Sequence, residues 1–280
     1  MALADYRNRA SVLVWVALMT LAAQRLLTIP ARGFTMMILG SPITVTITSS
    51  TVLGILLAAL VATGTEAVIR SHPRSNELLV PGGGLLASGR HWAYWALPVA
   101  VVIVALLLLP VTPSRFYWLA GLAVTGVALG LSMAGSYYTL DPFATGYRRA
   151  RIGMNALTYA VALALFLVVY RTRTRSIVSA TEVMLVSSLL ALELLRGSAR
   201  PLSLLALYAG ICGLLLGEAT WALNYWRLDS LTGGLILLLL FYNVVGVGQN
   251  ALQGRVSRRL LIEYFLITVA ATALIWELAP

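Results

Sequence analysis

Ionisable side chains inside apolar stretches are the residues of this sequence best suited to chemistry. Such positions are held by one arginine and five glutamates, namely Arg25, Glu66, Glu182, Glu193, Glu218 and Glu263. A charge is costly in hydrocarbon, so it usually pairs with an opposite charge, lines an ion path or carries a proton. These residues therefore predict either structural ion pairs or a site for proton or solute binding.

Depth along the predicted membrane spans divides these residues into two candidate sites. The first lies toward the predicted outer side and comprises Arg25, Glu182, Glu218 and Tyr225. The second lies toward the inner side and comprises Glu66, Glu193 and Glu263, which are near Arg70, Arg196 and Arg259. Most of them stand within two turns of a span end, so interfacial ion pairs that fix helix register are the alternative interpretation of both groups.

Helical spacing decides which of these residues share a face. Glu182 and Glu193 are eleven residues apart, or about 1100° round a helix, which places them on one side. Glu218 and Tyr225 are seven apart and also share a side. Glu218 and Asn224 are six apart and do not share one, so they cannot form a site without other helices.

A second type of polar pattern indicates helix packing. Asn243, Gly246 and Asn250 follow one face, where a small residue permits close approach and amides can bond across the contact. Gly213 and Gly217 have the spacing of a small-xxx-small motif, for which helix packing is again the favoured interpretation.

Familiar catalytic and metal-binding sets are absent from the sequence. Cys212 is the only cysteine, so no disulfide or cysteine metal site is predicted. His72 and His91 flank one loop, but no convincing third ligand accompanies them. No Ser/His/Asp set or HExxH motif occurs. We therefore predict no metal and no cofactor.

The elements that must position these side chains are membrane helices. The 280 residues are 60% hydrophobic and 11% charged, with a mean hydropathy of +0.88. Nine apolar segments long enough to span a bilayer are predicted at 10–29, 49–70, 92–110, 116–135, 152–170, 176–195, 202–222, 231–252 and 259–278. The predicted fold is an all-α bundle in one domain over residues 1–280. Alternation at 43–48 predicts a strand or an extended segment at the surface, with a re-entrant element as the alternative.

The net charge of +10 comes from 20 arginines, with no lysine. The arginines lie in short loops, which indicates contact with lipid headgroups and argues against a nucleic-acid partner. Thirteen fall on one side of the predicted spans and six on the other, with Arg25 inside the first span. The positive-inside rule therefore predicts a cytoplasmic N-terminus, an external C-terminus and a multi-pass protein of the cell membrane.

Three segments carry a resemblance. "RSHP", "GEATWALNYW" and "RLLIEYF" together are similar to an uncharacterised group of bacterial polytopic membrane proteins. The resemblance implies a multi-helix membrane fold and no activity. Three functions are consistent with the residues: a non-catalytic subunit acting through lipids and other membrane subunits, a small-solute or proton-coupled transporter, and an enzyme acting on a lipid-linked substrate.

Overall fold

The computed structural model describes residues 2–25, 32–38, 41–47, 49–73, 90–172, 176–198, 200–226 and 228–278. Its α-helices are α1 (Ala2–Ala23), α2 (Ser49–Arg70), α4 (Ala96–Leu108), α5 (Arg115–Tyr138), α6 (Tyr147–Thr172), α7 (Ser176–Leu195), α8 (Leu202–Leu223), α9 (Ser230–Leu252) and α10 (Arg258–Leu278). Two 3₁₀ turns, η1 (Arg90–Trp95) and η2 (Leu109–Val111), extend α4 at its ends. The predicted all-α bundle is confirmed.

The predicted segments and the observed helices agree in number and order within the described residues. The first helix differs most, because α1 begins at Ala2 and ends at Ala23, whereas the apolar segment was predicted at 10–29. Residues 26–29 lie outside the described part. Seven helices, α2 and α4 to α9, are long and apolar enough to cross a membrane. Membrane crossing by α1 and α10 stays a prediction.

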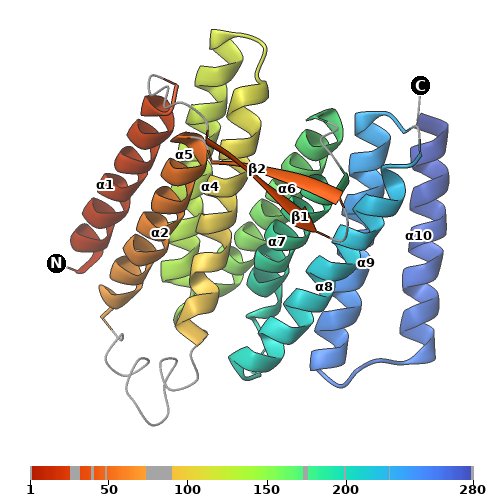
Figure 1. Cartoon of the computed structure of the whole chain (residues 1–280). Coiled ribbons are helices and arrows are strands. Elements are labelled where there is room, and N and C mark those ends of the chain that lie inside the picture. Colours follow the sequence, from red (N-terminus) through yellow and green to blue (C-terminus); the bar gives the residue numbers. More distant parts are fainter. Residues whose placement is uncertain are drawn as a thin grey trace.

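The helices run alternately up and down, so that α1 begins and α10 ends at opposite ends of the bundle (Figure 1). α1 and α10 lie on opposite flanks, with α4 and α6 between them (Figure 1). The core contains fully buried Leu97, Leu129, Phe166, Leu190 and Phe241, which come from five different helices. Buried residues of α1, α2 and α4 to α9 form one continuous hydrophobic core. No described residue of α10 belongs to this core, and this helix packs on α9.

Glycines set the closest helix contacts. A Cβ at Gly213 of α8 would collide with the Met184 carbonyl oxygen of α7, and one at Gly217 would lie 3.1 Å from the Ala180 carbonyl oxygen. The predicted packing role of this pair is therefore confirmed. After α9, Gly254 adopts φ +69°, which ends the helix in a left-handed turn before α10.

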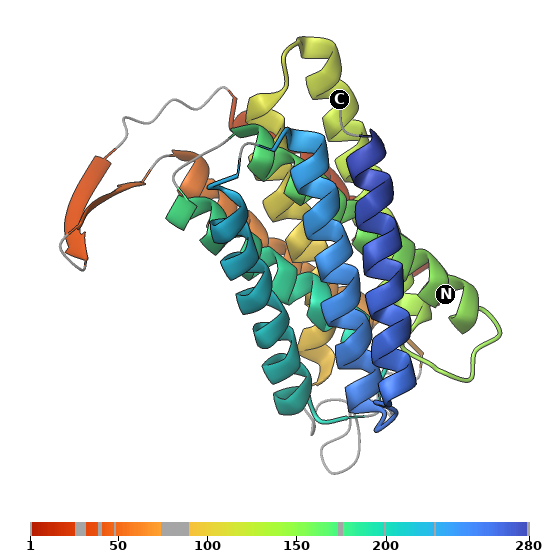
Figure 2. The same ribbon diagram turned by 90° about the vertical axis from the view of Figure 1, so that its right-hand side faces the viewer.

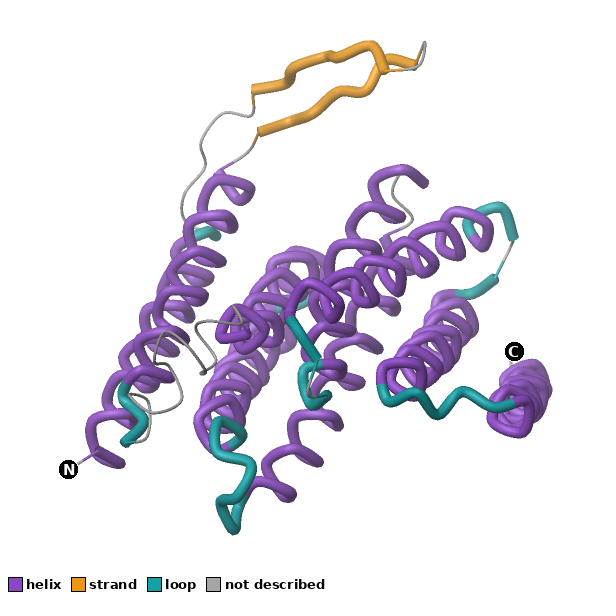
Figure 3. The backbone as a smooth tube through the Cα atoms, turned by 90° about the horizontal axis from the view of Figure 1, so that it is seen from below, coloured by secondary structure: helices purple, strands orange, loops and turns teal. Residues whose placement is uncertain are grey.

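A small hairpin projects from the bundle (Figures 2 and 3). Its strands are β1 (Arg32–Ile38) and β2 (Ser41–Ile47), which pair antiparallel with Phe34 opposite Val45. The alternation at 43–47 is thus confirmed as a strand, while residue 48 lies outside the described part. The partner strand β1 was not predicted, because its sequence does not alternate between polar and apolar residues.

Candidate functional site

A buried ion cluster lies at the C-terminal end of α7, which is at the same end of the bundle as the N-terminus (Figure 1). After the predicted topology, we call this the inner end of the bundle and the opposite one the outer end. Glu193 is fully buried, and each of its carboxylate oxygens accepts a hydrogen bond from an arginine. The Arg196 Nε donates to Glu193 Oε2 at 2.7 Å, and the Arg151 Nη1 of α6 donates to Oε1 at 3.3 Å. Two positive charges therefore enclose one negative charge in a nearly dry site.

The arginines of this end also cap the last carbonyl groups of the helices. The Arg151 Nη2 donates to the carbonyl oxygens of Glu193 at 3.1 Å and Leu194 at 2.7 Å. Gln249 of α9 donates to the same Leu194 oxygen, and Arg200 Nε donates to the Leu252 oxygen at the end of α9. A helix leaves its last four carbonyls without intrahelical partners, so these contacts satisfy groups that would otherwise be unpaired.

Arg196 has further partners on two other elements. Its Nη2 donates to Thr139 Oγ1 at 2.9 Å, and its guanidinium carbon lies 4.1 Å from the centre of the Tyr94 ring. The cluster thereby connects η1, the end of α5, α6, α7 and α9. Its oxygens are engaged with donors, so the arrangement is suited to holding helices together and not to accepting a substrate proton.

The other two predicted inner glutamates form separate pairs. Glu66 of α2 pairs with Arg70 at 2.8 Å and accepts from Trp95 Nε1 at 3.1 Å. Glu263 of α10 pairs with Arg259 at 3.1 Å on an exposed surface. All three glutamates therefore pair with the arginines that the sequence places beside them. They do not form one site, since α2 and α10 lie far apart in the bundle (Figure 1).

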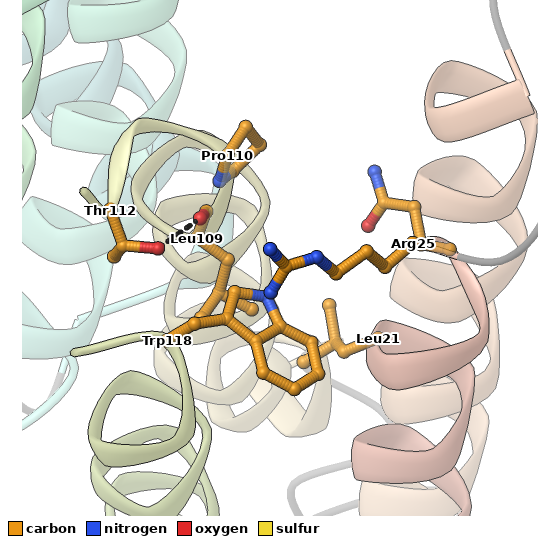
Figure 4. Close-up of a pocket in the computed structure, with 7 residues that line it drawn as sticks. Leu21, Arg25, Leu109, Pro110, Thr112 and Trp118 are labelled. Atoms are coloured by element: carbon orange, nitrogen blue, oxygen red, sulfur yellow. Dashed lines mark hydrogen bonds between the residues drawn. The ribbon is translucent and has the colours of Figure 1, made fainter. Parts of the chain in front are cut away.

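Arg25 occupies a different setting at the outer end. It extends from the end of α1 over Trp118 of α5, with its guanidinium carbon 5.1 Å from the ring centre (Figure 4). The cavity beside it has a volume of about 380 Å³ and is lined by Leu21, Gln24, Arg25, Leu109, Pro110, Thr112 and Trp118. Among the described residues no carboxylate forms an ion pair with Arg25. Arg25 was expected from the sequence, whereas Trp118 was not, because it is distant in sequence and resembles an ordinary interfacial aromatic residue.

The first candidate site is not assembled as the sequence analysis expected. Arg25 packs among α1, η2 and α5, whereas Glu182 belongs to α7, and Glu218 belongs to α8 on another part of the bundle (Figure 1). Helical spacing fixes which face a residue occupies, but not which helices are neighbours, and the expected pairing of Arg25 with a glutamate failed for that reason. Asn224 donates to Ser179 of α7 and so faces inward, away from the exposed Glu218, as the spacing predicted.

Glu218 and Tyr225 belong to an exposed seam on α8. We call this the α8 seam and define it as Leu207, Ile211, Leu214, Glu218, Trp221 and Tyr225, all exposed. Its members alternate in steps of four and three residues, the spacing of one helix packing along another. Tyr225 follows the last turn of α8, and Gly210 beside the seam has open space where a side chain would be. Glu218 is the only charge in this seam.

The predicted packing face on α9 contacts α10. Tyr264 of α10 lies directly over Gly246, where a Cβ would collide with its hydroxyl group. Asn250 and Asn243 donate to carbonyl oxygens of their own helix, those of Gly246 and Leu239. Elsewhere, the His72 ring packs against Tyr137, and the His91 side chain lies outside the described part. No group of three potential metal ligands occurs among the described residues.

Fold and site together define an α-helical bundle in which seven helices are long and apolar enough to cross a membrane and in which most buried charges are paired within the chain. Residues 29–277 match the model of a family described as a protein of unknown function, DUF5656, and the chain belongs to this family. The expectation of an uncharacterised group is thereby confirmed. Searches of curated proteins and of solved structures give no match.

Proposed function

We propose that this protein is a non-catalytic membrane subunit that binds a transmembrane helix of a partner protein along the α8 seam. The observation that carries the proposal is Glu218, an exposed carboxylate in the last two turns of α8 on an otherwise apolar helix face. Among the described residues no hydrogen bond or ion pair satisfies it. A charge facing lipid is costly, and a partner that supplies a counter-charge removes that cost.

The chemistry of the seam specifies the partner. Spacing of four and three residues matches one side of a helix pair, and a single polar residue in such a seam fixes register at the expense of some stability. The partner helix should therefore place a basic or amide side chain at the depth of Glu218. A second copy of this chain fits less well, because parallel packing about a twofold axis would bring two Glu218 carboxylates together.

The alternatives of transport and catalysis receive less support. A path lined by Glu182, Glu193, Glu218 and Asn243 would require these side chains to face a common space. Glu193 is instead enclosed by two arginines, and Glu218 points out of the bundle. A lipid-acting enzyme would need a cleft beside Glu218, whereas its neighbours Leu214 and Trp221 are exposed on a convex helix face.

We also infer that the protein lies in the cell membrane with its N-terminus in the cytoplasm. The arginine distribution supports this orientation, since 13 arginines fall on the side of the N-terminus and six on the other. Cysteines introduced at residues 3 and 279 in intact cells test it. An impermeant thiol reagent should react with the cysteine at 279, which would be external, and not with the cysteine at 3. The native Cys212 should not interfere, because it is buried. Reaction at residue 3 alone would show that the orientation is the opposite of the one proposed.

Photo-crosslinking in native membranes tests the proposed partner surface. A photo-reactive amino acid is placed at Leu207, Ile211 or Leu214, and for comparison at Leu131, which is exposed on α5. We expect the three α8 positions to yield the same adduct and Leu131 to yield none. The Glu218→Leu variant should lose the adduct, because the polar contact that selects the partner is gone.

Sequencing of the crosslinked peptide completes the test. The proposal requires a transmembrane segment with an arginine, lysine, histidine or amide residue within one turn of the crosslink. Exchanging the two charges, with Glu218→Arg and the partner's basic residue changed to glutamate, should restore the adduct. An adduct between two copies of α8, or equal crosslinking at Leu131, would overturn the proposal.

A further inference from the structure

We propose that the outer-end cavity between α1, η2 and α5 binds the phosphate headgroup of an anionic lipid. Among the described residues that line it, Arg25 is the only charged one. Its guanidinium retains all five donors, because none of the described residues accepts a hydrogen bond from it. Arginine is well matched to phosphate, which it contacts with two parallel hydrogen bonds. The cavity volume of about 380 Å³ is within the usual range for small-molecule sites, roughly 300–1,000 Å³.

Two neighbouring side chains complement the guanidinium. Gln24 lines the same cavity and offers an amide donor. Trp118 supports the guanidinium from below and restricts its motion (Figure 4). Thr112 donates its hydroxyl hydrogen to the Leu109 carbonyl oxygen at 2.7 Å, so it presents an acceptor and not a donor to the cavity (Figure 4). An acceptor beside two donors suits a ligand that has a hydroxyl group next to its phosphate.

A second cavity supplies room for a hydrocarbon chain. It has a volume of about 330 Å³ and shares Gln24 and Pro110 with the first cavity. Its other lining residues come from α2 and α4, and they are mostly apolar: Thr51, Gly54, Ile55, Ala58, Ile103, Leu106 and Leu107. A phosphate at Arg25 and an acyl chain between α2 and α4 would therefore occupy adjoining spaces. This continuity favours a phospholipid over a free phosphate.

The site is independent of the α8 seam, which lies on another part of the bundle, so either proposal can fail alone. Binding is measured with the full-length protein in neutral detergent, by native mass spectrometry and by the lipid-induced rise in melting temperature. The probes are phosphatidylglycerol, phosphatidylcholine and glycerol phosphate. The variants are Arg25→Gln and, as a matched control, Arg115→Gln, which removes an exposed arginine from the same end without touching the cavity.

We expect phosphatidylglycerol to bind at least about tenfold more tightly than the other two probes. Phosphatidylcholine carries a positive charge beside its phosphate and has no headgroup hydroxyl to donate to Thr112, and glycerol phosphate has no acyl chain for the second cavity. Arg25→Gln should abolish the difference between the two lipids, and Arg115→Gln should preserve it. Equal binding by Arg25→Gln and the unaltered protein would overturn the site. Binding of glycerol phosphate as tight as that of phosphatidylglycerol would assign the cavity to a free phosphate and overturn the lipid.

The hydrocarbon cavity has its own test. Ala58→Leu fills part of the space between α2 and α4 without removing a polar group. It should weaken binding of phosphatidylglycerol by about tenfold, because the added leucine side chain takes up space that the acyl chain would otherwise fill. An unchanged affinity in an Ala58→Leu protein that melts at the normal temperature would exclude this path for the acyl chain.

Discussion

The two ends of the bundle use arginine in opposite ways. At the inner end, Arg151 and Arg196 are largely buried and contact a carboxylate, three carbonyl or hydroxyl oxygens and an aromatic ring. At the outer end, Arg25 is exposed in a cavity, and its guanidinium lies over the ring of Trp118 without a hydrogen bond to any described residue. The same side chain is therefore fully satisfied in one region and retains its hydrogen-bonding capacity in the other.

The presence or absence of hydrogen-bonding partners distinguishes arginines that stabilise the fold from an arginine that can bind a ligand. A buried, paired charge is costly to disrupt, because removing one partner leaves the other without compensation. An unpaired arginine on a cavity wall contributes little to folding, and its donors remain available to a ligand. Substitutions at the inner end should thus affect stability, and substitutions at Arg25 should affect lipid binding.

The largest effect is expected from Glu193→Gln. The substitution leaves Arg151 and Arg196 without their counter-charge in a site where Glu193 is fully buried. Breaking a buried ion pair in this way typically costs about 3–5 kcal/mol. Unfolding in mixed micelles should show a loss of that order in the free energy of unfolding, together with a lower melting temperature.

Glu263→Gln is the matched control for this substitution. Glu263 makes a comparable contact with Arg259, but that arginine side chain is 90% exposed. Exposed pairs contribute about 0–1 kcal/mol, so the control should unfold almost normally. If the two variants lost equal stability, the distinction between a buried clamp and surface pairs would be wrong.

A smaller effect is expected from Arg151→Gln. This change removes one arm of the ion cluster and two hydrogen bonds to the last carbonyls of α7. Hydrogen bonds from charged groups contribute about 1.5–3 kcal/mol, and we expect a loss of about 2–3 kcal/mol in the free energy of unfolding.

In lipid-free detergent, Arg25→Gln should change the free energy of unfolding by less than about 0.5 kcal/mol. A large loss from Arg25→Gln under these conditions would show that the outer arginine is also structural.

The sequence predicted the helices and the local ion pairs well. Apolar length identified each helix, and a separation of three or four residues placed Glu66 beside Arg70 and Glu193 beside Arg196. It could not show that Arg151 reaches Glu193, because that contact spans 42 residues and depends on α6 and α7 packing together. The contact between Arg25 and Trp118 was missed for the same reason. Spacing specifies a face, whereas neighbours follow from packing of the whole bundle.

A loss smaller than those of the ion cluster is expected at the outer end of α9, where the start of the helix is capped locally. Asp229 is the N-cap and accepts a hydrogen bond from the Thr232 backbone N–H at 3.3 Å. Hydrogen bonding from the Thr232 side chain and backbone lowers the pKa of Asp229 below its ordinary value. Asp229→Ala should cost up to about 1 kcal/mol at neutral pH, the usual contribution of such a cap.

The pH dependence of this loss distinguishes a cap from a long-range contact. A lowered pKa in the folded state means that the stabilisation is complete above the unfolded pKa, about 3.9, and is lost as the pH falls through the folded pKa. The unfolding free energies of the unaltered protein and Asp229→Ala should therefore converge in acid. Asp229→Asn caps without a charge, so the difference in unfolding free energy between Asp229→Asn and Asp229→Ala should not change with pH. A pH-independent gap between the unaltered protein and Asp229→Ala would mean that the carboxylate charge does not contribute to the cap, in contrast to the charge of Glu193 at the inner end.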